Sequence, residues 1–281
     1  GLRDEEEVDI MFSVRSLQTI LFFTDVGKVY SAKAYEIPSG GRTDKGISPH
    51  NVLSLGSGER ITAAVPVPSF ADADFCTMVT RRGIIKRVAL SKFESVRPSG
   101  LIAISLREGD ELGWVRVTLS GEELLIITAQ GQALRFSTEL VRSMGRSAAG
   151  VKGINLREGD SVTGVEVVKD ENNQLLVVTS GGYGKRTSMS AYPAKGRGTG
   201  GVTTLARRLL SKTGPIVAAR RVMPEDHITI VTTNGQALRT TVANVPHLGR
   251  ATMGSRLIRL RESDTVASVA RLADFEIEAK S

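Results

Sequence analysis

The sequence contains little cysteine, histidine or aromatic residue, and it has no long apolar run. Its single cysteine, Cys76, cannot form an intrachain disulfide, which is typical of a protein in a reducing compartment, so we expect a cytoplasmic location. No stretch approaches the ~20 apolar residues that a membrane-spanning helix needs. The three histidines lie far apart without a cysteine or carboxylate cluster beside them, so no metal site is expected.

Signatures of enzyme chemistry are also scarce. The chain has neither a Gly-x-Ser-x-Gly motif nor a glycine-rich loop that ends in Gly-Lys-Ser/Thr. Residues 196–201 match the dinucleotide pattern G-x-G-x-x-G, but no strand leads directly into them, and Arg220 and Arg221 stand where a ribose-binding acid belongs. We therefore expect no catalytic residue, no metal ion and no cofactor in this chain.

What the sequence does contain is a fivefold repeat. Five times an apolar segment ends in a threonine, a tight glycine turn and a basic segment, with the turn glycines at Gly27, Gly83, Gly131, Gly182 and Gly235. A second glycine follows 17 or 19 residues later in every unit, at Gly46, Gly100, Gly150, Gly201 and Gly254. Repeats of about 50 residues are typical of propellers and related arrays, in which each unit buries its apolar faces against its neighbours.

Each unit carries the signals of β structure, and about 50 residues accommodate four strands with their turns. A further β segment opens each unit, at residues 9–14, 61–67, 112–117, 162–168, 216–222 and 265–272. Three of these follow near-identical turns of the type Leu-Arg-Glu-Gly/Ser-Asp, at residues 106–110, 156–160 and 260–264. We predict an all-β, propeller-like disc of five to six four-stranded blades over residues 1–271, a short tail at 272–281, and helix only within Val202–Lys212.

Positive charge is concentrated in one part of every unit. The stretches from the strand threonine to the second glycine, residues 24–46, 80–100, 128–150, 179–201 and 232–254, hold 19 Lys and Arg against 5 Asp and Glu. The remaining residues hold 18 against 25. Edge strands often carry Lys and Arg simply to prevent aggregation, but that role does not explain an acidic remainder. If the units surround an axis, these stretches form a basic belt around a ring.

A continuous basic belt on a curved body favours a polyanion as partner, held by phosphate neutralisation and counterion release. Duplex DNA is a better candidate than a single strand, because aromatics make up only 5% of the chain and single-strand binders use aromatic stacking platforms. Bending a duplex costs on the order of 1–6 kcal/mol per 20–30 base pairs, which several phosphate contacts in each blade offset. We thus predict DNA wrapping without sequence preference. The alternative is a propeller-like scaffold that binds an acidic protein or RNA.

Four segments carry a family resemblance: Phe22-Phe-Thr-Asp-Val-Gly-Lys-Val-Tyr30, Lys33-Ala-Tyr-Glu-Ile-Pro38, Arg146-Ser-Ala-Ala-Gly150 and Gly249-Arg-Ala-Thr-Met-Gly254. They resemble the C-terminal domain of the bacterial DNA gyrase A protein, and the resemblance covers essentially the whole chain. It implies a β-pinwheel, in which neighbouring blades exchange a strand and DNA wraps around the rim. It also implies a nucleoid-associated, non-catalytic role beside the rest of gyrase A and its partner gyrase B, where ATP and Mg drive strand passage and negative supercoiling.

The sequence departs from that family in its number of units. The family's Gln-Arg-Arg-Gly-Gly-Lys/Arg-Gly box belongs to a first blade that this chain lacks, and the nearest match left is residues 195–201. Either a first blade precedes the chain, or the disc has five blades. The second case would bring it nearer to the corresponding protein of topoisomerase IV, whose equivalent domain bends DNA. The amino-acid sequences of residues 22–30 and 33–38 favour gyrase.

Within the basic stretches, we expect lysines and arginines to contact phosphate or line the rim, except those that point inward. The tyrosines of these stretches are not expected to break DNA, because no helical DNA-breaking module surrounds them. The candidate DNA-binding residues are Lys28, Lys33, Arg42, Lys45, Arg81, Arg82, Lys86, Arg87, Arg97, Arg135, Arg142, Arg146, Lys185, Arg186, Lys195, Arg197, Arg239 and Arg250.

Overall fold

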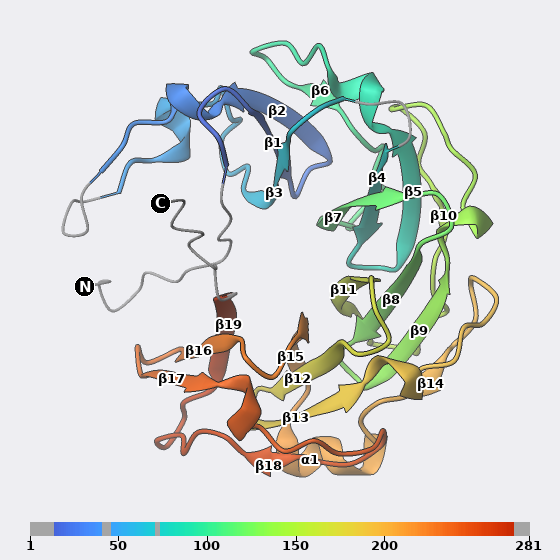
Figure 1. The fold of residues 1–281 in the computed structure, drawn as a ribbon, viewed down its shortest axis with the longest axis vertical. Coiled ribbons are helices and arrows are strands. Elements are labelled where there is room, and N and C mark those ends of the chain that lie inside the picture. Colours follow the sequence, from blue (N-terminus) through green and yellow to red (C-terminus); the bar gives the residue numbers. More distant parts are fainter. Residues whose placement is uncertain (1–13, 41–45, 71–73, 273–281) are drawn as a thin grey trace, which may run out of the picture.

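Five antiparallel β-sheets follow one another around a common axis (Figure 1). The computed structural model describes residues 14–40, 46–70 and 74–272. The predicted all-β, bladed architecture is confirmed, and the five repeat units correspond to the five sheets. Most of the expected segment at 9–14, and all but the first residue of the expected tail at 272–281, lie outside the described residues.

A hairpin forms the centre of each blade. The hairpin strands are β1 (Thr19–Thr24) and β2 (Lys28–Lys33), β4 (Asp74–Thr80) and β5 (Ile84–Ala89), β8 (Glu123–Thr128) and β9 (Gln132–Ser137), β12 (Gln174–Thr179) and β13 (Tyr183–Ser188), and β16 (His227–Thr232) and β17 (Ala237–Thr241). The turn glycines are needed for two reasons that Gly131 illustrates. Its φ of +88° suits glycine, and a Cβ there would lie 2.2 Å from the carbonyl oxygen of Leu205.

An inner strand pairs with the first strand of each hairpin. These strands are β3 (Ile61–Val67), β7 (Leu112–Leu119), β11 (Val162–Val168), β15 (Ile216–Val222) and β19 (Val266–Leu272), which agree with the predicted opening segments to within two residues. They stand closest to the axis in Figure 1, and each pairing contains an irregularity beside the hairpin threonine, as at Phe23/Thr24. The inner strands therefore line the centre of the disc.

The outer strands are exchanged between neighbouring blades. They are β6 (Leu101–Ile102), β10 (Val151–Lys152), β14 (Val202–Thr203) and β18 (Ser255–Arg256). Each of them follows the hairpin of its own unit but pairs with the second hairpin strand of the preceding blade, as β6 does with β2. This is the strand exchange of a pinwheel. Four sheets thus have four strands, whereas the fifth has three among the described residues, in the order β17-β16-β19.

The three middle blades are packed between two neighbours, which buries their hairpin strands on both faces, whereas among the described residues the first and fifth blades each share a core with one neighbour. Residues 124–128 of β8 and 175–179 of β12 are all buried, so these strands appear in the sequence as unbroken apolar runs rather than alternating ones. Between the first two blades, the rings of Phe23 and Phe93 meet edge to face at 5.8 Å. Burying each such side chain contributes about 1.5–3 kcal/mol.

Helix is limited to single turns. One 3-10 turn follows the second hairpin strand of each unit: η1 (Ala34–Glu36), η3 (Leu90–Phe93), η4 (Thr138–Leu140), η5 (Met189–Ala191) and η7 (Val242–Asn244). Another, η2 (Pro49–Asn51), stands alone, while η6 (Arg207–Leu209) continues into α1 (Leu210–Thr213). The short helix predicted within 202–212 is therefore present, although its first two residues are strand β14. Across the part of the chain that the structure describes, no helix is long and apolar enough to span a membrane.

Candidate nucleic-acid interface

The chain reaches each outer strand through a loop that follows the edge of the disc. We call residues 90–100, 138–150, 189–201 and 242–254 the rim loops, and each ends in a second glycine of the repeat. Bridges such as Arg87 to Ser143 and Arg135 to Ala194 place a rim loop beside the second hairpin strand of the preceding blade. In Figure 1 these loops and the outer strands occupy the periphery. The repeat therefore brings the predicted basic stretches to one edge.

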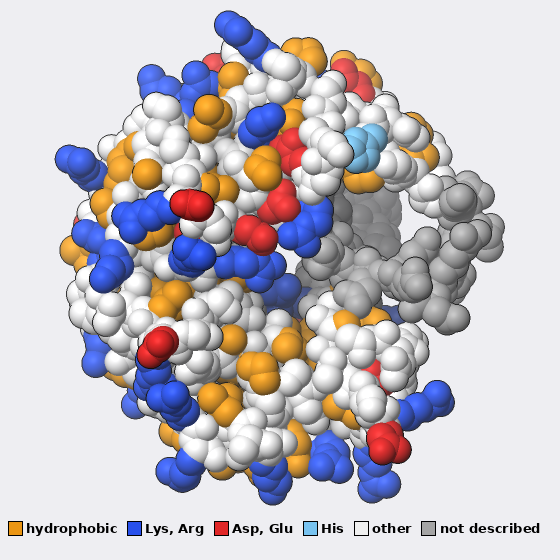
Figure 2. All heavy atoms as spheres, turned by 180° about the vertical axis from the view of Figure 1, so that it is seen from behind, with side chains coloured by type: hydrophobic (Ala, Val, Ile, Leu, Met, Phe, Trp, Pro, Cys, Tyr) orange, Lys and Arg blue, Asp and Glu red, His pale blue; other side chains and the backbone are white. Residues whose placement is uncertain are grey.

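The rim loops carry six of the predicted cations that remain accessible. The four loops together contain seven Lys and Arg against two Asp and Glu. Figure 2 shows Lys and Arg side chains projecting around much of the visible edge. The predicted residues that lie on these loops with exposed or partly exposed side chains are Arg97, Arg142, Arg146, Lys195, Arg197 and Arg250.

Lys86 and Lys185 do not lie on the surface where the sequence predicts them. Both are buried, because the outer strands and rim loops of two units cover them. The Lys86 Nζ donates to the carbonyl oxygens of Ala103, at 2.7 Å, and Arg146. The Lys185 Nζ donates to the carbonyl oxygens of Thr204, at 2.7 Å, and Gly249, at 3.0 Å. These lysines are removed from the interface, since their ammonium groups bind backbone and not solvent.

Burial also changes how these two lysines titrate. Removal from water disfavours the ammonium form and lowers the pKa of Lys86 to about 8. The same effect, with a smaller contribution from the positive charge of Arg250, lowers the pKa of Lys185 to about 8. Each lysine joins a rim loop to the segment after the preceding outer strand, so it fixes the position of the rim from inside.

In the second, third and fourth blades, the arginine at the next position of the second hairpin strand is also mainly structural. The Arg186 Nε donates to the carbonyl oxygen of Val245 at 2.7 Å, and its Nη2 to that of Ala243 at 3.2 Å. Its repeat equivalent Arg135 forms ion pairs with Glu123 and Glu171 and donates to carbonyl oxygens around η5. Arg87 is buried with its guanidinium 4.3 Å from the Phe75 ring centroid. The structure thus assigns Arg135 and Arg186 to contacts with the next unit, and Arg87 to packing within its own blade.

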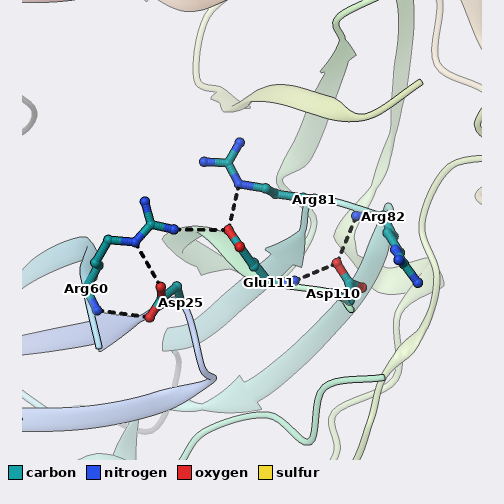
Figure 3. A network of polar contacts seen from close by, with 6 residues as sticks. All are labelled: Asp25, Arg60, Arg81, Arg82, Asp110 and Glu111. Carbon is teal, nitrogen blue, oxygen red and sulfur yellow. Dashed lines mark hydrogen bonds and ion pairs between the residues drawn. The ribbon is translucent and has the colours of Figure 1, made fainter. Parts of the chain in front are cut away.

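Arg81 turns toward the axis instead of the rim. Its Nε lies 3.2 Å from a Glu111 carboxylate oxygen, which Arg60 also approaches at 3.4 Å (Figure 3). Among the remaining predicted residues, Lys33, Arg82 and Arg239 are exposed and Lys28 is half-buried. Arg42 and Lys45 lie outside the described residues.

The predicted Leu-Arg-Glu-Gly-Asp turns are confirmed, and they also fix the hairpin tips. The Asp110 Oδ1 accepts hydrogen bonds from the backbone N–H groups of Arg82, at 3.0 Å, and Glu111, at 2.8 Å (Figure 3). Asp160 and Asp264 accept equivalent bonds in the third and fifth blades. These aspartates are structural, because their Oδ1 atoms are occupied by backbone donors.

Sequence reasoning missed several exposed cations at the edge. Lys152 lies in β10 and Arg256 in β18, one step beyond the stretches that end at the second glycine. Arg256 lies over the Tyr183 ring at 5.3 Å and donates to its hydroxyl at 3.0 Å. The repeat could have identified both residues, because each follows the second glycine of its unit by two positions. The other missed cations are Lys92, Arg207, Arg208 and Lys212.

For metals, the described residues contain no group of three or more His, Cys, Asp or Glu side chains that could hold an ion. Cys76 is buried in β4, where its thiol packs in the core between the first two blades. Burial raises the pKa of this thiol above its usual range. Within the same residues, the chemistry that the structure offers at its edge is therefore cationic.

Known proteins match the chain over the same five units. A family model described as the DNA gyrase C-terminal domain, a β-propeller, matches residues 18–68, 74–118, 122–169, 173–223 and 226–273. The DNA gyrase A protein of Mycolicibacterium smegmatis is 40% identical over 283 residues, which cover 100% of this chain and 33% of that protein. The DNA gyrase A protein of Mycobacterium tuberculosis is 38% identical over 276 residues, covering 98% of this chain and 33% of that protein. The chain thus spans about a third of the length of these relatives.

Solved structures share the fold over nearly the whole chain. A crystal structure of the C-terminal domain of DNA topoisomerase IV aligns with a TM-score of 0.87 at 26% identity, covering 97% of this chain and 84% of that one. A structure of the DNA gyrase A C-terminal domain aligns with a TM-score of 0.79 at 30% identity, covering 92% of this chain and 84% of that one. With five family matches on five blades, the chain belongs to the DNA gyrase C-terminal domain family of β-propellers.

Proposed function

We propose that this chain binds duplex DNA without sequence preference and wraps it around the rim, as the DNA-wrapping domain of a gyrase A protein. One observation carries the proposal: exposed cations recur on consecutive rim loops and therefore form one edge. The acidic residues lie mostly elsewhere in the chain. A curved edge of this kind matches the phosphate backbone and not the bases, so affinity arises mainly from counterion release.

The rim contacts are carried by side chains on rigid supports. Lys86 and Lys185 hold the backbone of the rim loops next to Arg146 and Arg250, so those arginines are presented without a large ordering cost. The proposed contact set combines predicted and newly found residues: Arg97, Arg142, Arg146, Lys152, Lys195, Arg250 and Arg256. Arg197 is left out, because its guanidinium donates to the carbonyl oxygens of Leu140 and Lys152, as that of Arg186 does to its own backbone acceptors.

In the holoenzyme, the proposed role is to present wrapped DNA to an ATP-driven strand-passage core that introduces negative supercoils. The rest of gyrase A and its partner gyrase B take part in this role, and the bacterial cytoplasm with its nucleoid is its location. Family membership supports this assignment, and so does the similarity to full-length gyrase A proteins. No catalytic step is assigned to this chain.

The alternative is the DNA-bending role of the equivalent topoisomerase IV domain. The backbone favours it slightly, since the topoisomerase IV structure aligns with the higher TM-score, 0.87 against 0.79. Sequence favours gyrase, because that structure is 26% identical whereas the gyrase A domain is 30% identical and full-length gyrase A proteins reach 40%. We place more weight on identity, because both solved domains share this fold.

The test is ligation of nicked circular DNA in the presence of the chain, followed by gel measurement of the linking number and a parallel salt titration. A linking-number shift that grows with protein concentration supports chiral wrapping. Binding without a shift favours the bending role, and no binding to DNA favours a scaffold for an acidic protein or RNA. The double variant Arg142→Gln/Arg146→Gln should reduce the shift, whereas Arg107→Gln/Arg157→Gln, which removes two exposed charges from hairpin-capping turns, serves as its matched control.

A further inference from the structure

The rim loop at residues 90–100 is two residues shorter than the other three rim loops. The turn glycine and the second glycine are 17 residues apart in this unit and 19 residues apart in the other units. Each longer loop forms a parallel bridge to the second hairpin strand of the preceding blade, at Ser143, Ala194 and His247. Among the described residues, the short loop forms no such bridge to β2. The edge of β2 therefore lacks a contact that the other covered blades have.

Ser31 of β2 occupies the position that the bridge meets in the other blades. It lies opposite Leu21 in the same hairpin register that Arg186 has in the fourth blade. The N–H and C=O groups of Arg186 point away from their hairpin and bond to residues 246 and 248 of the next rim loop, at 3.0 and 2.9 Å. The same groups of Ser31 therefore point outward, and the described residues of the next unit offer them no backbone partner.

The positions on either side of Ser31 are already occupied. Two residues before it, Val29 pairs with Leu101 of β6, which lies beside β2 in Figure 1. Two residues after it, the Lys33 N–H donates to the Glu36 carboxylate at 2.7 Å. Ser31 is thus one open position on an edge that is otherwise satisfied. Such a position favours pairing with another extended chain, because strand edges gain backbone hydrogen bonds in this way.

A cavity of about 490 Å³ opens over this position. Residues 31–33 of β2 form its floor, residues 51–54 form one wall, and Glu94, Val96 and Pro98 of the short rim loop form the other. The volume is within the usual range for binding clefts. In the blades with longer rim loops, the bridging residues occupy the equivalent edge.

The charge of this cavity differs from that of the rest of the rim. Among the described residues that line it, Glu36 and Glu94 are acidic and Lys33 is basic. The Lys33 Nζ donates to the Thr19 hydroxyl at 2.9 Å. The Glu94 carboxylate is exposed and has no partner among the described residues. A phosphate group is disfavoured beside two carboxylates, whereas a positively charged side chain is attracted to them.

We propose that this cavity, which we call the β2 edge site, binds an extended segment of a partner protein. The segment runs parallel to β2, as the rim-loop bridges do, and bonds to the N–H and C=O groups of Ser31. It places a Lys or Arg side chain beside Glu94 and an apolar side chain against Val96. Backbone hydrogen bonds supply the affinity, and the two side chains supply the specificity. The site takes a protein ligand and is distinct from the proposed DNA contacts.

The chain itself provides a probe for this site. Residues 141–146, Val-Arg-Ser-Met-Gly-Arg, bridge the second blade in the way that the β2 edge site lacks. Within them, the Met144 N–H donates to the Arg87 carbonyl oxygen at 2.9 Å. A fluorescein-labelled peptide of this sequence therefore carries the backbone donor, the basic side chains and the apolar side chain that the site requires.

The experiment titrates the 281-residue chain into the labelled peptide and follows fluorescence anisotropy. We expect saturable binding with a dissociation constant below about 1 mM. A second peptide, methylated on the backbone nitrogen of its methionine, keeps every charge but loses the N–H that donates to the Ser31 carbonyl oxygen. It should bind at least about tenfold more weakly.

Two variants of the chain test the walls of the site. Glu94→Lys should weaken peptide binding about fivefold, because attraction is replaced by repulsion. Glu108→Lys changes an equally exposed carboxylate in a hairpin-capping turn and should leave the affinity unchanged. Replacing residues 90–100 by a copy of residues 138–150 restores the longer loop, so this variant should lose the peptide. Circular dichroism establishes that each variant folds.

Three results would overturn the proposal. They are the absence of saturation up to about 1 mM peptide, equal affinities of the two peptides, and equal losses for Glu94→Lys and Glu108→Lys. Sedimentation of the chain alone tests for a second copy as the occupant. A dimer that disappears when residues 90–100 are replaced would assign the site to self-association and overturn the partner proposal. The DNA-wrapping assay contains no peptide, so failure of either proposal leaves the other intact.

Discussion

The fourth and fifth blades treat the same repeat position in opposite ways. In β13, Arg186 is held by carbonyl oxygens of the next unit, and its neighbour Lys185 is buried. In β17, the equivalent Arg239 is exposed and Leu238 is only partly buried. The difference arises because β18 covers β13, whereas no strand of the described residues pairs with the outer edge of β17. A basic residue of this repeat is therefore structural or accessible according to its neighbour.

The largest expected effect comes from displacing the strand that distinguishes the two blades. Gly254, with a φ of +81°, precedes β18, and a Cβ there would lie 2.3 Å from the carbonyl oxygen of Gly184. Gly254→Ala should cost about 3 kcal/mol or more, from left-handed strain and from the clash. Urea denaturation measures this cost. Gly249→Ala in the same loop, where a Cβ meets nothing within 4 Å, should change stability by less than about 0.5 kcal/mol. Equal losses would contradict the assigned role of β18.

The next effect depends on pH. The pKa of Lys185 is about 8 in the folded chain, below its usual value of 10.5, so between these values the unfolded state binds more protons than the folded state. Stability from this group therefore rises as pH increases from about 8 to 10.5, by about 1–3 kcal/mol. Unfolding free energies at pH 7.5, 9 and 10, for the wild type and Lys185→Met, isolate the contribution. In the variant, the unfolding free energy should lack the part of the increase with pH that comes from this lysine. Parallel curves of unfolding free energy against pH for the two proteins would contradict this expectation.

A smaller effect separates the two blades at a fixed pH. At pH 7, Lys185→Met leaves the carbonyl oxygens of Thr204 and Gly249 without their donor, and the gain from removing a buried charge offsets part of the loss. We expect a net destabilisation of about 1–2 kcal/mol. Leu238→Met, at the same repeat position in the fifth blade, should fall within about 0.5 kcal/mol of the wild type. Thermal melts of both variants measure the difference between their stability losses. Equal losses would mean that the cover of β18 over β13 does not matter.

The fold was largely predictable from the sequence, since the turn glycines and the apolar runs mark every hairpin. In the middle blades, burial on both faces made those runs continuous. The inner strands agree with the expected segments to within two residues. The exchange of outer strands was available only through family resemblance, because strands of two residues, such as β10, carry no periodicity of their own. Lys86 shows why the accessible cations of the site could not all be predicted from the sequence. Its side chain follows the same strand pattern as accessible cations, and only the packing of the neighbouring unit reveals that it is buried.

The smallest expected effect concerns DNA binding by the exposed Arg239 of the fifth blade and by the covered Arg186 of the fourth. Arg239→Gln should leave stability within about 0.5 kcal/mol of the wild type, because the side chain is exposed on an uncovered edge. If the fifth blade contributes to the wrap, this change should lower the slope of log affinity against log salt by about 0.9, the value of one phosphate contact. Arg186→Gln should show the reverse, with a stability loss of about 1–3 kcal/mol and an unchanged slope, because its guanidinium is occupied by backbone acceptors. Binding measured across a salt series for both variants decides the matter. A reduced slope for Arg186→Gln would mean that covered arginines also reach DNA, and the distinction between the two blades would then fail.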